Sequence, residues 1–405
     1  MHEERRFPVW LQFACVAGYF GTDLFLRFSY QAVLGADVNT HSEYSDEDYV
    51  IERYSKPAFM VLCGYILFFF WGPLLVWPYL KFVKKVSVVN YYQTTWCGDL
   101  EFREALRYTC IMGCILFLGN LGYVAGLRYI NVPLASALSQ GEAPFTVALS
   151  VLFLHRVFGK NEKIGTGLSF TGIVLIAVPP VLRAEQAAQY YGNGDDVAAS
   201  APADVLDQFG GILSTLIGAF GFGCYQVFWP MFDGCRYSAA NPAPTNPIDA
   251  IIDTFATLSL VGAFLLSTGW VALVLFHLFG WETFEVPPES IRGALLFSTI
   301  LMAIVDALNG IACVIASAMV VALSYPLIIP LSVVMQVFID GIPISEWGVM
   351  GWIGTVLVVA GVFCLEANGE DGESDGDVDN NSMDSKYLRN TGSNIEMEEL
   401  VGVYA

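Results

Sequence analysis

Charge is scarce in this 405-residue chain. Asp, Glu, Lys and Arg together make up 14% of its residues, whereas soluble globular domains hold roughly 25%. Hydrophobic residues make up 55%, and the mean hydropathy is +0.55. This composition excludes an ordinary soluble domain and indicates a protein of the lipid bilayer.

Residues with the chemistry of an active site are also few. The chain has four His, two in polar segments (His2, His41) and two at predicted helix ends (His155, His277), so no three-ligand metal site or catalytic triad is apparent. Its nine Cys show neither metal nor disulfide spacing. No Gly-rich phosphate loop follows a strand, because no strand is predicted. We therefore expect neither an enzyme nor a cofactor.

Long apolar segments are what the chain has in abundance. A membrane-spanning helix needs about 20 predominantly apolar residues. Ten windows qualify, near 9–34, 58–80, 106–127, 132–154, 164–182, 209–232, 254–279, 291–316, 317–339 and 347–365. The sequence therefore predicts an all-α polytopic membrane protein with ten transmembrane helices.

These windows form two similar sets of five. Ala137-Leu138-Ser139 recurs as Ala322-Leu323-Ser324 at an offset of 185, and five residues from Glu162 to Val178 recur from Glu346 to Val362 at an offset of 184. Because five is odd, the second set enters the membrane from the opposite side. Inverted five-helix repeats of this kind let a carrier expose one central site alternately to each face.

The distribution of Lys and Arg predicts the orientation. With a cytosolic N-terminus, thirteen of these residues fall on the cytosolic side and five on the other, as the positive-inside rule requires. Both termini are then cytosolic. We expect the membrane to be an endomembrane (Golgi or vesicle) or the plasma membrane.

Composition divides the chain into four parts. The first repeat is expected at 1–182, a polar linker at 183–204, the second repeat at 205–366 and an acidic, disordered cytosolic tail at 367–405. The formal net charge of −20 arises largely from the tail and from the loop at 36–56, which we interpret as solvated segments. We expect a lipid bilayer and a small solute as partners, and no nucleic acid.

Four ionisable residues fall within the apolar windows, where burying a charge costs about 2.5–3.5 kcal/mol and indicates function. Asp23 and Arg27 are spaced i, i+4 and either neutralise each other or serve the site. Glu142 and Asp306 have no adjacent basic residue. They are either charge partners of a substrate, open to proton coupling, or protonated acids that join helices.

Further polar residues occupy matching places in the two repeats. Asn120 and Tyr123 correspond to Asp306 and Asn309 at an offset of 186, while Gln140 and Tyr325 each follow the repeated Ser. Polar side chains at equal depth in both repeats are what a cavity on the pseudo-twofold axis needs. The alternative is that they only bridge helices.

Prolines and glycines punctuate the same helices. Pro144, Pro230, Pro326 and Pro330 are expected to interrupt helices at depth and free backbone carbonyls. Closely spaced glycines, such as Gly122/Gly126 and Gly218/Gly221, indicate tight helix packing. A homodimer is compatible with such faces.

The stretch from Ala135 to Val178, with its small-residue helix start, mid-helix Pro-Phe, basic loop and Gly-rich fifth helix, resembles the drug/metabolite transporter superfamily, whose EamA-like members have ten helices in two inverted repeats. Tyr225-Gln226-Val227-Phe228, Trp281-Glu282 and Ser324-Tyr325-Pro326 resemble subgroup F of solute carrier family 35, which includes thiamine-transporter-like members. The resemblance implies an alternating-access transporter.

The residues favour a cationic or neutral solute such as thiamine or an amine. Many nucleotide-sugar carriers place Lys or Arg late in the sixth or ninth helix, whereas this chain has none there, and deep aromatic rings suit an organic cation. We therefore assign substrate binding to Glu142, Asp306, Asn120, Tyr123, Gln140, Asn309, Tyr325, Arg27 and Asp23. Two alternatives stay open: a nucleotide-sugar or phosphorylated-metabolite exchanger that uses Arg27, and a non-transporting membrane scaffold.

Overall fold

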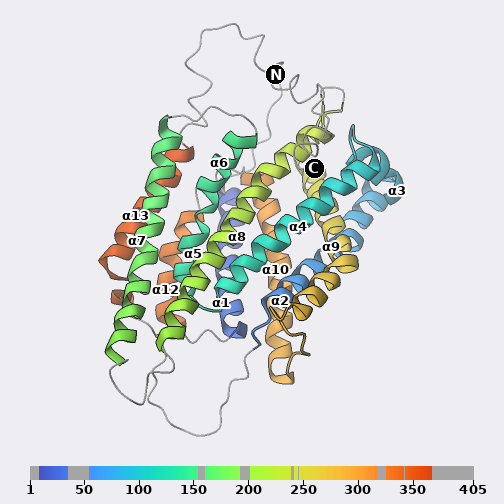
Figure 1. Ribbon diagram of the computed structural model, residues 1–405. Coiled ribbons are helices and arrows are strands. Elements are labelled where there is room, and N and C mark those ends of the chain that lie inside the picture. The colour runs from blue at the N-terminus through green and yellow to red at the C-terminus, as the bar shows by residue number, and fades with distance from the viewer. Residues whose placement is uncertain are drawn as a thin grey trace, which may run out of the picture.

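The molecule is a bundle of helices (Figure 1). The computed structural model describes residues 9–34, 54–153, 160–191, 201–238, 241–244, 246–316, 325–341 and 343–366, and in these ranges every regular element is a helix. Helices long and apolar enough to cross a membrane span Pro57–Lys84, Phe102–Gly126, Leu206–Arg236, Pro247–Leu278 and Glu289–Ala312. The prediction of an all-α polytopic membrane protein is confirmed. Ten spans in two inverted repeats stay a prediction.

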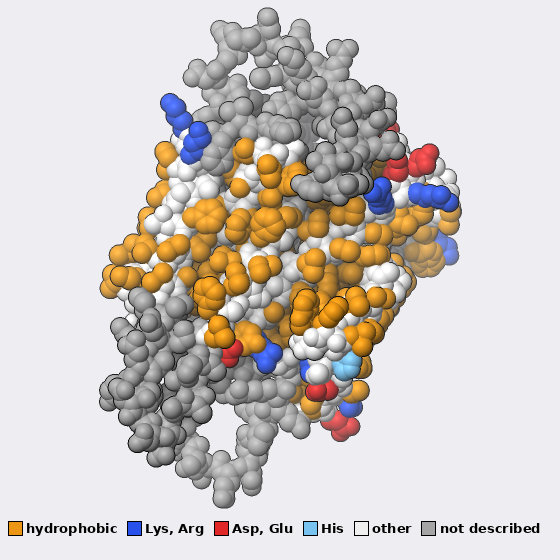
Figure 2. All heavy atoms as spheres, in the orientation of Figure 1, with side chains coloured by type: hydrophobic (Ala, Val, Ile, Leu, Met, Phe, Trp, Pro, Cys, Tyr) orange, Lys and Arg blue, Asp and Glu red, His pale blue; other side chains and the backbone are white. Residues whose placement is uncertain are grey.

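The surface agrees with a membrane location. On the face drawn in Figure 2, hydrophobic side chains cover a broad middle band, and charged side chains gather towards its two margins. A bilayer demands this pattern, because its hydrocarbon core excludes unpaired charge.

The first part of the chain supplies the helices α1 (Val9–Leu34), α2 (Pro57–Phe68), η1 (Gly72–Val76), η2 (Tyr79–Lys84), α3 (Val88–Asn90), η3 (Tyr91–Trp96), α4 (Phe102–Gly126), α5 (Val132–Ser139), α6 (Glu142–Phe153) and α7 (Lys160–Tyr191). The second part supplies α8 (Ala201–Arg236), α9 (Pro247–Leu278), α10 (Glu289–Ala316), η4 (Tyr325–Leu327), α12 (Ile328–Asp340), η5 (Ile344–Trp347) and α13 (Gly348–Glu366).

The predicted linker and tail lie partly or wholly outside the residues that the structure describes. α7 continues to Tyr191 and α8 begins at Ala201, so helix extends into both ends of the predicted linker 183–204. The rest of that linker, the Ala322-Leu323-Ser324 repeat and the tail 367–405 lie outside the described residues.

Glycines bring two pairs of helices into backbone contact, as their spacing predicts. A Cβ atom on Gly122 of α4 would lie 2.7 Å from the Gly218 nitrogen of α8. A Cβ atom on Gly172 of α7 would lie 2.6 Å from the Gly354 carbonyl oxygen of α13. Because larger residues do not fit, these pairs are held by close backbone packing.

The fourth predicted span is broken in the middle. α5 ends at Ser139 and α6 begins at Glu142, with two turn residues between them. Pro144 explains the break, because proline lacks an N–H and its ring clashes with the carbonyl four residues earlier, that of Gln140. The expected interruption was wrong for Pro230, which lies inside the continuous α8.

A buried cluster of charged residues lies where α8 ends. α8 continues to Arg236, so the expectation that the sixth helix has no basic residue near its end was wrong. Arg236 is 1% exposed and binds Asp253 of α9 (Nη2–Oδ2 2.7 Å) and Asp233 (2.6 Å). It also donates to the Trp96 carbonyl (3.1 Å), and its own carbonyl accepts from the Asp99 N–H (2.8 Å). This buried ion cluster joins α8, α9 and the segment after η3.

Candidate functional site

An ion pair on α1 forms the centre of the candidate site. Asp23 and Arg27, one turn apart, are each 8% exposed. Arg27 Nε and Nη2 both lie 2.9 Å from Asp23 Oδ2. Of the two sequence interpretations of this pair, mutual neutralisation matches the geometry.

The third guanidinium nitrogen of Arg27 is engaged by the first repeat. Nη1 donates to the hydroxyl oxygens of Tyr123 on α4 (2.9 Å) and of Ser136 and Ser139 on α5 (3.2 and 3.4 Å). The guanidinium carbon also lies 5.0 Å from the centre of the Tyr123 ring, as in a cation–π contact. Every nitrogen of this cation therefore already has a partner within the protein.

Aromatic and amide groups link α1 to the other repeat. The hydroxyls of Tyr19 and Tyr325 are hydrogen-bonded to each other, and the Tyr325 ring meets Phe20 edge-on at 5.6 Å. Gln140, the residue at the break between α5 and α6, donates to the Tyr325 carbonyl at 3.4 Å. The two residues that the sequence paired by their place in the repeats thus touch each other.

Glu142 begins α6, where a negative charge suits the positive end of the helix dipole. Its carboxylate accepts from the Gln226 amide of α8, and Gln226 in turn accepts from the Thr146 hydroxyl at 3.1 Å. Arg27 and Asp23 both act on Glu142 electrostatically. Glu142 therefore has a basic group within range, which its neighbours in the sequence do not supply.

Asp306 and Asn309 lie half-buried on α10, one turn apart. Asp306 forms no ion pair or hydrogen bond with the residues that the structure describes, and the charge of Asp23 acts on it electrostatically. The hydroxyls of Tyr30 on α1 and Tyr65 on α2 also interact with it electrostatically. With no fixed partner among the described residues, this carboxyl group is available to a ligand.

Asn120 is joined to the same region through a residue that the sequence did not single out. Its amide donates to the Tyr65 hydroxyl, which itself donates to the Leu116 carbonyl at 3.2 Å. Tyr65 is 1% exposed, so this chain of bonds is buried.

Four polar partners were missed in the sequence: Tyr65, Ser136, Ser139 and Gln226. Ser139 belongs to the repeated Ala-Leu-Ser motif and Gln226 to the Tyr225-Gln226-Val227-Phe228 motif, so the sequence held a signal for both. Nothing in the local sequence distinguished Tyr65 or Ser136 from packing residues.

The chemistry of the site follows from its charges. The site contains three carboxyl groups (Asp23, Glu142, Asp306) and one guanidinium (Arg27), which leaves a formal excess of negative charge when all are ionised. No cluster of three His, Cys, Asp or Glu with the geometry to hold a metal occurs in the described part of the chain.

Part of the chain matches a known protein family. Residues 58–178 match the model of the EamA-like transporter family. This chain contains an EamA-like transporter domain. The resemblance to the drug/metabolite transporter superfamily is thereby confirmed, and the domain covers α2 to most of α7.

The curated relatives are named as transport and membrane proteins. The chain is 22% identical over 274 residues to the thiamine-repressible mitochondrial transport protein of Saccharomyces cerevisiae, covering 67% of this chain and 66% of that one. It is 22% identical over 273 residues to an uncharacterized vacuolar membrane protein of the same yeast, covering 67% and 64%. An uncharacterized transporter of Schizosaccharomyces pombe is 23% identical over 273 residues, covering 67% and 71%. The matched part spans about two thirds of the length of these relatives.

Proposed function

We propose that this protein is an alternating-access secondary transporter of a small organic solute that is cationic or neutral, such as thiamine or an amine. One observation carries the proposal. All three nitrogens of Arg27 are bound by the protein itself, whereas among the residues that the structure describes Asp306 has no ion-pair or hydrogen-bond partner and Glu142 has only a neutral amide donor. Charge in the site is therefore available for a cation and not for an anion.

The helix pairing supports two inverted repeats. The first set consists of α1, α2, α4, α5–α6 and α7, and the second set consists of α8, α9, α10, α12 and α13. When each helix is replaced by its counterpart in the other set, the α1–α10 pair becomes the α8–α4 pair. The pairs α2–α9, α5–α12 and α7–α13 are converted into themselves. All of these pairs are in contact. Such symmetry is expected when two repeats surround one site.

Within this proposal the residues have distinct roles. Glu142 and Asp306 are the charge partners of the solute, and each is able to carry a proton for coupling. Tyr325, Gln140, Asn120 and Asn309 orient the solute. Tyr123 acts indirectly, because its hydroxyl is bound to Arg27.

The competing functions need more than the geometry offers. An exchanger of nucleotide sugars requires a cation for the phosphates, and Arg27 would have to leave Asp23, Tyr123 and two serines to provide it. A scaffold has no need for three acids at membrane depth. The name of one yeast relative refers to repression by thiamine, which places thiamine first among the solutes to test.

The location is also a proposal. One relative is named as a mitochondrial transport protein and another as a vacuolar membrane protein. We place this chain in an endomembrane or the plasma membrane with both termini in the cytosol.

Uptake into proteoliposomes tests the function. The full chain is reconstituted, and uptake of labelled thiamine is compared with uptake of a labelled nucleotide sugar, in wild type and in Glu142→Gln. We expect saturable thiamine uptake that Glu142→Gln abolishes. Saturable nucleotide-sugar uptake that survives Glu142→Gln and is lost in Arg27→Gln would overturn the assignment.

A further inference from the structure

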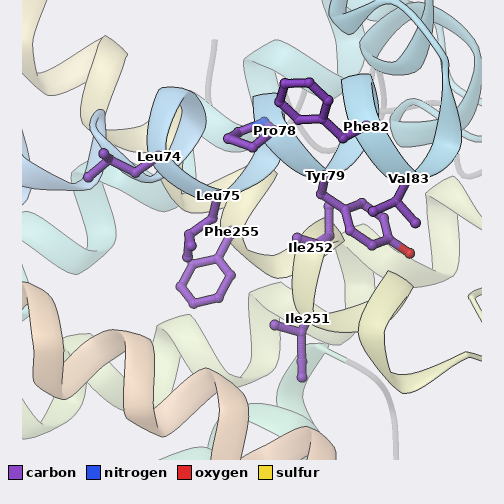
Figure 3. Close-up of a pocket in the computed structure, with 9 residues that line it drawn as sticks. All are labelled: Leu74, Leu75, Pro78, Tyr79, Phe82, Val83, Ile251, Ile252 and Phe255. Carbon is purple, nitrogen blue, oxygen red and sulfur yellow. The ribbon is translucent and has the colours of Figure 1, made fainter.

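A second recess, separate from the central site, lies between the continuation of α2 and the start of α9 (Figure 3). It is an open groove with a volume of about 480 Å³, which is within the range of small-molecule sites. The lining residues are Leu74, Leu75, Pro78, Tyr79, Phe82, Val83, Ile251, Ile252 and Phe255. None of them belongs to the central site.

The helical segment that forms one wall is irregular. Two prolines, Pro73 and Pro78, each remove a backbone donor, and the chain winds in π turns over Gly72–Val76 and Tyr79–Lys84. Such turns are rare and frequently occur at functional sites. The groove lies where this distorted segment faces α9.

The residues that line the groove favour a hydrocarbon ligand over a polar one. Tyr79 carries the only polar side-chain atom among the nine residues, and its hydroxyl already donates to Asp249 Oδ1 at 2.7 Å. The lips of the groove are exposed, with Leu74 at 63% and Phe82 at 67%. A water-soluble ligand would find no polar partner here, whereas an acyl chain needs none.

Three lysines cluster in the same turns as the groove. Lys84 is paired with Asp249 at 2.8 Å. Lys81 Nζ lies 5.7 Å from the centre of the Phe82 ring, which lines the groove, and 4.7 Å from that of Trp77. Neither Lys81 nor Lys85 forms an ion pair with any described residue. Two positive charges beside an apolar groove complement a negatively charged headgroup joined to an acyl chain.

We propose that this groove binds an acyl chain of an anionic glycerophospholipid whose headgroup phosphate contacts Lys81 and Lys85. The predicted orientation places this end of the helices in the cytosolic leaflet, where anionic lipids are concentrated and each Lys near the surface favours binding. The inference goes beyond the transport function and does not depend on the identity of the solute.

Binding of added lipid to the delipidated full chain in detergent tests this site. Native mass spectrometry measures the affinity for phosphatidylserine and for phosphatidylcholine with the same acyl chains. Wild type is expected to prefer phosphatidylserine, and K81Q/K85Q to weaken phosphatidylserine binding roughly 25-fold, because each lysine contributes about fivefold. The matched control K160Q/K163Q removes two exposed lysines from α7 and is expected to change nothing. Equal binding of both lipids by wild type, or equal loss in the two double variants, would overturn the proposal.

A second measurement locates the chain directly. Phosphatidylserine with a photoreactive acyl chain is crosslinked to wild type, and labelled peptides are identified. Label is expected in residues 74–83 and 251–255, and Leu75→Trp, which fills the groove, is expected to remove it. Label confined to other helices, or undiminished in Leu75→Trp, would show that the groove is not the site.

Discussion

The guanidinium of Arg27 is held by Asp23 one turn earlier on α1, with Nε and Nη2 both 2.9 Å from Oδ2. Because both contacts come from the same helix, the ion pair fixes the orientation of the guanidinium. Nη1 is then directed to Tyr123, Ser136 and Ser139. The pair thus ties α1 to α4 and α5, and the other two acids of the site form no ion pair with Arg27 or with any other described residue.

This ion pair should stabilise the fold as a unit. Asp23→Asn or Arg27→Gln alone leaves a buried charge uncompensated, and each is expected to cost about 3–5 kcal/mol. The double variant should cost less than the sum of the two, because it leaves no lone charge. Thermal unfolding of the four proteins in one detergent measures the coupling. Additive losses would mean that the pair is not a unit.

The close contact of α4 and α8 predicts intolerance to added volume. Gly122→Ala puts a Cβ atom 2.7 Å from the Gly218 nitrogen, and overpacking of this kind costs about 1–3 kcal/mol. Gly167→Ala is the matched control, because a Cβ atom there meets nothing within 4 Å. The melting temperature should fall in Gly122→Ala alone. An equal fall in both would place the cost elsewhere than in the helix contact.

The buried cluster around Arg236 predicts a strong effect at the end of the bundle. Arg236→Gln leaves Asp253 without its cation and is expected to cost about 3–5 kcal/mol. Arg107→Gln removes an exposed arginine and should change stability by no more than about 0.5 kcal/mol. The melting temperatures of the two variants are compared with that of wild type. Near-equal values for the two variants would contradict the burial of the cluster.

Glu282 predicts a pH dependence. Its carboxylate accepts from the N–H groups of Ala58 (2.8 Å) and Phe59 (3.0 Å) at the start of α2, yet burial raises the pKa of Glu282 above its ordinary value. The folded chain therefore holds this proton more tightly than the unfolded chain, so the Glu282 contribution to stability should increase as the pH falls from 7 to about 5. Glu282→Gln should lose that increase. A difference between wild type and variant that is constant with pH would contradict the prediction.

Glu142 and Asp306, which form no ion pair with any described residue, separate a carrier from a scaffold. In Glu142→Gln/Asp306→Asn we expect normal membrane delivery and a melting temperature close to that of wild type, together with loss of transport. Microscopy, thermal unfolding and uptake are measured on the same protein. Full retention of the cellular function by this double variant would favour the scaffold.

Much of the fold was predictable because hydropathy acts over whole helices. The windows at 9–34 and 291–316 agree with α1 and α10 within two residues. The π turns after α2 and the end of α7 at Tyr191 were not predictable, because local winding and polar helix extensions leave no mark on hydropathy.

The site was predictable in part, for a different reason. Asp23, Arg27, Glu142 and Asp306 stand out because charge is costly in a bilayer. Their partners do not, since Tyr65 and Ser136 are ordinary residues of membrane helices until the fold brings them to Asn120 and Arg27. The burial of Arg236 was missed likewise, because Asp253 lies on the next helix and its approach depends on packing.

The most direct test of the account is ligand-induced stabilisation of the purified protein, since it reports binding without requiring transport. Thiamine and a nucleotide sugar are each titrated against wild type, Glu142→Gln and Arg27→Gln, and the melting temperature is followed. At about 100 times Kd, a bound ligand adds about 2.7 kcal/mol. We expect thiamine to raise the melting temperature of wild type but not of Glu142→Gln, and the nucleotide sugar to raise neither. Stabilisation of wild type by the nucleotide sugar, lost in Arg27→Gln, would contradict the central claim that the acids recognise the solute.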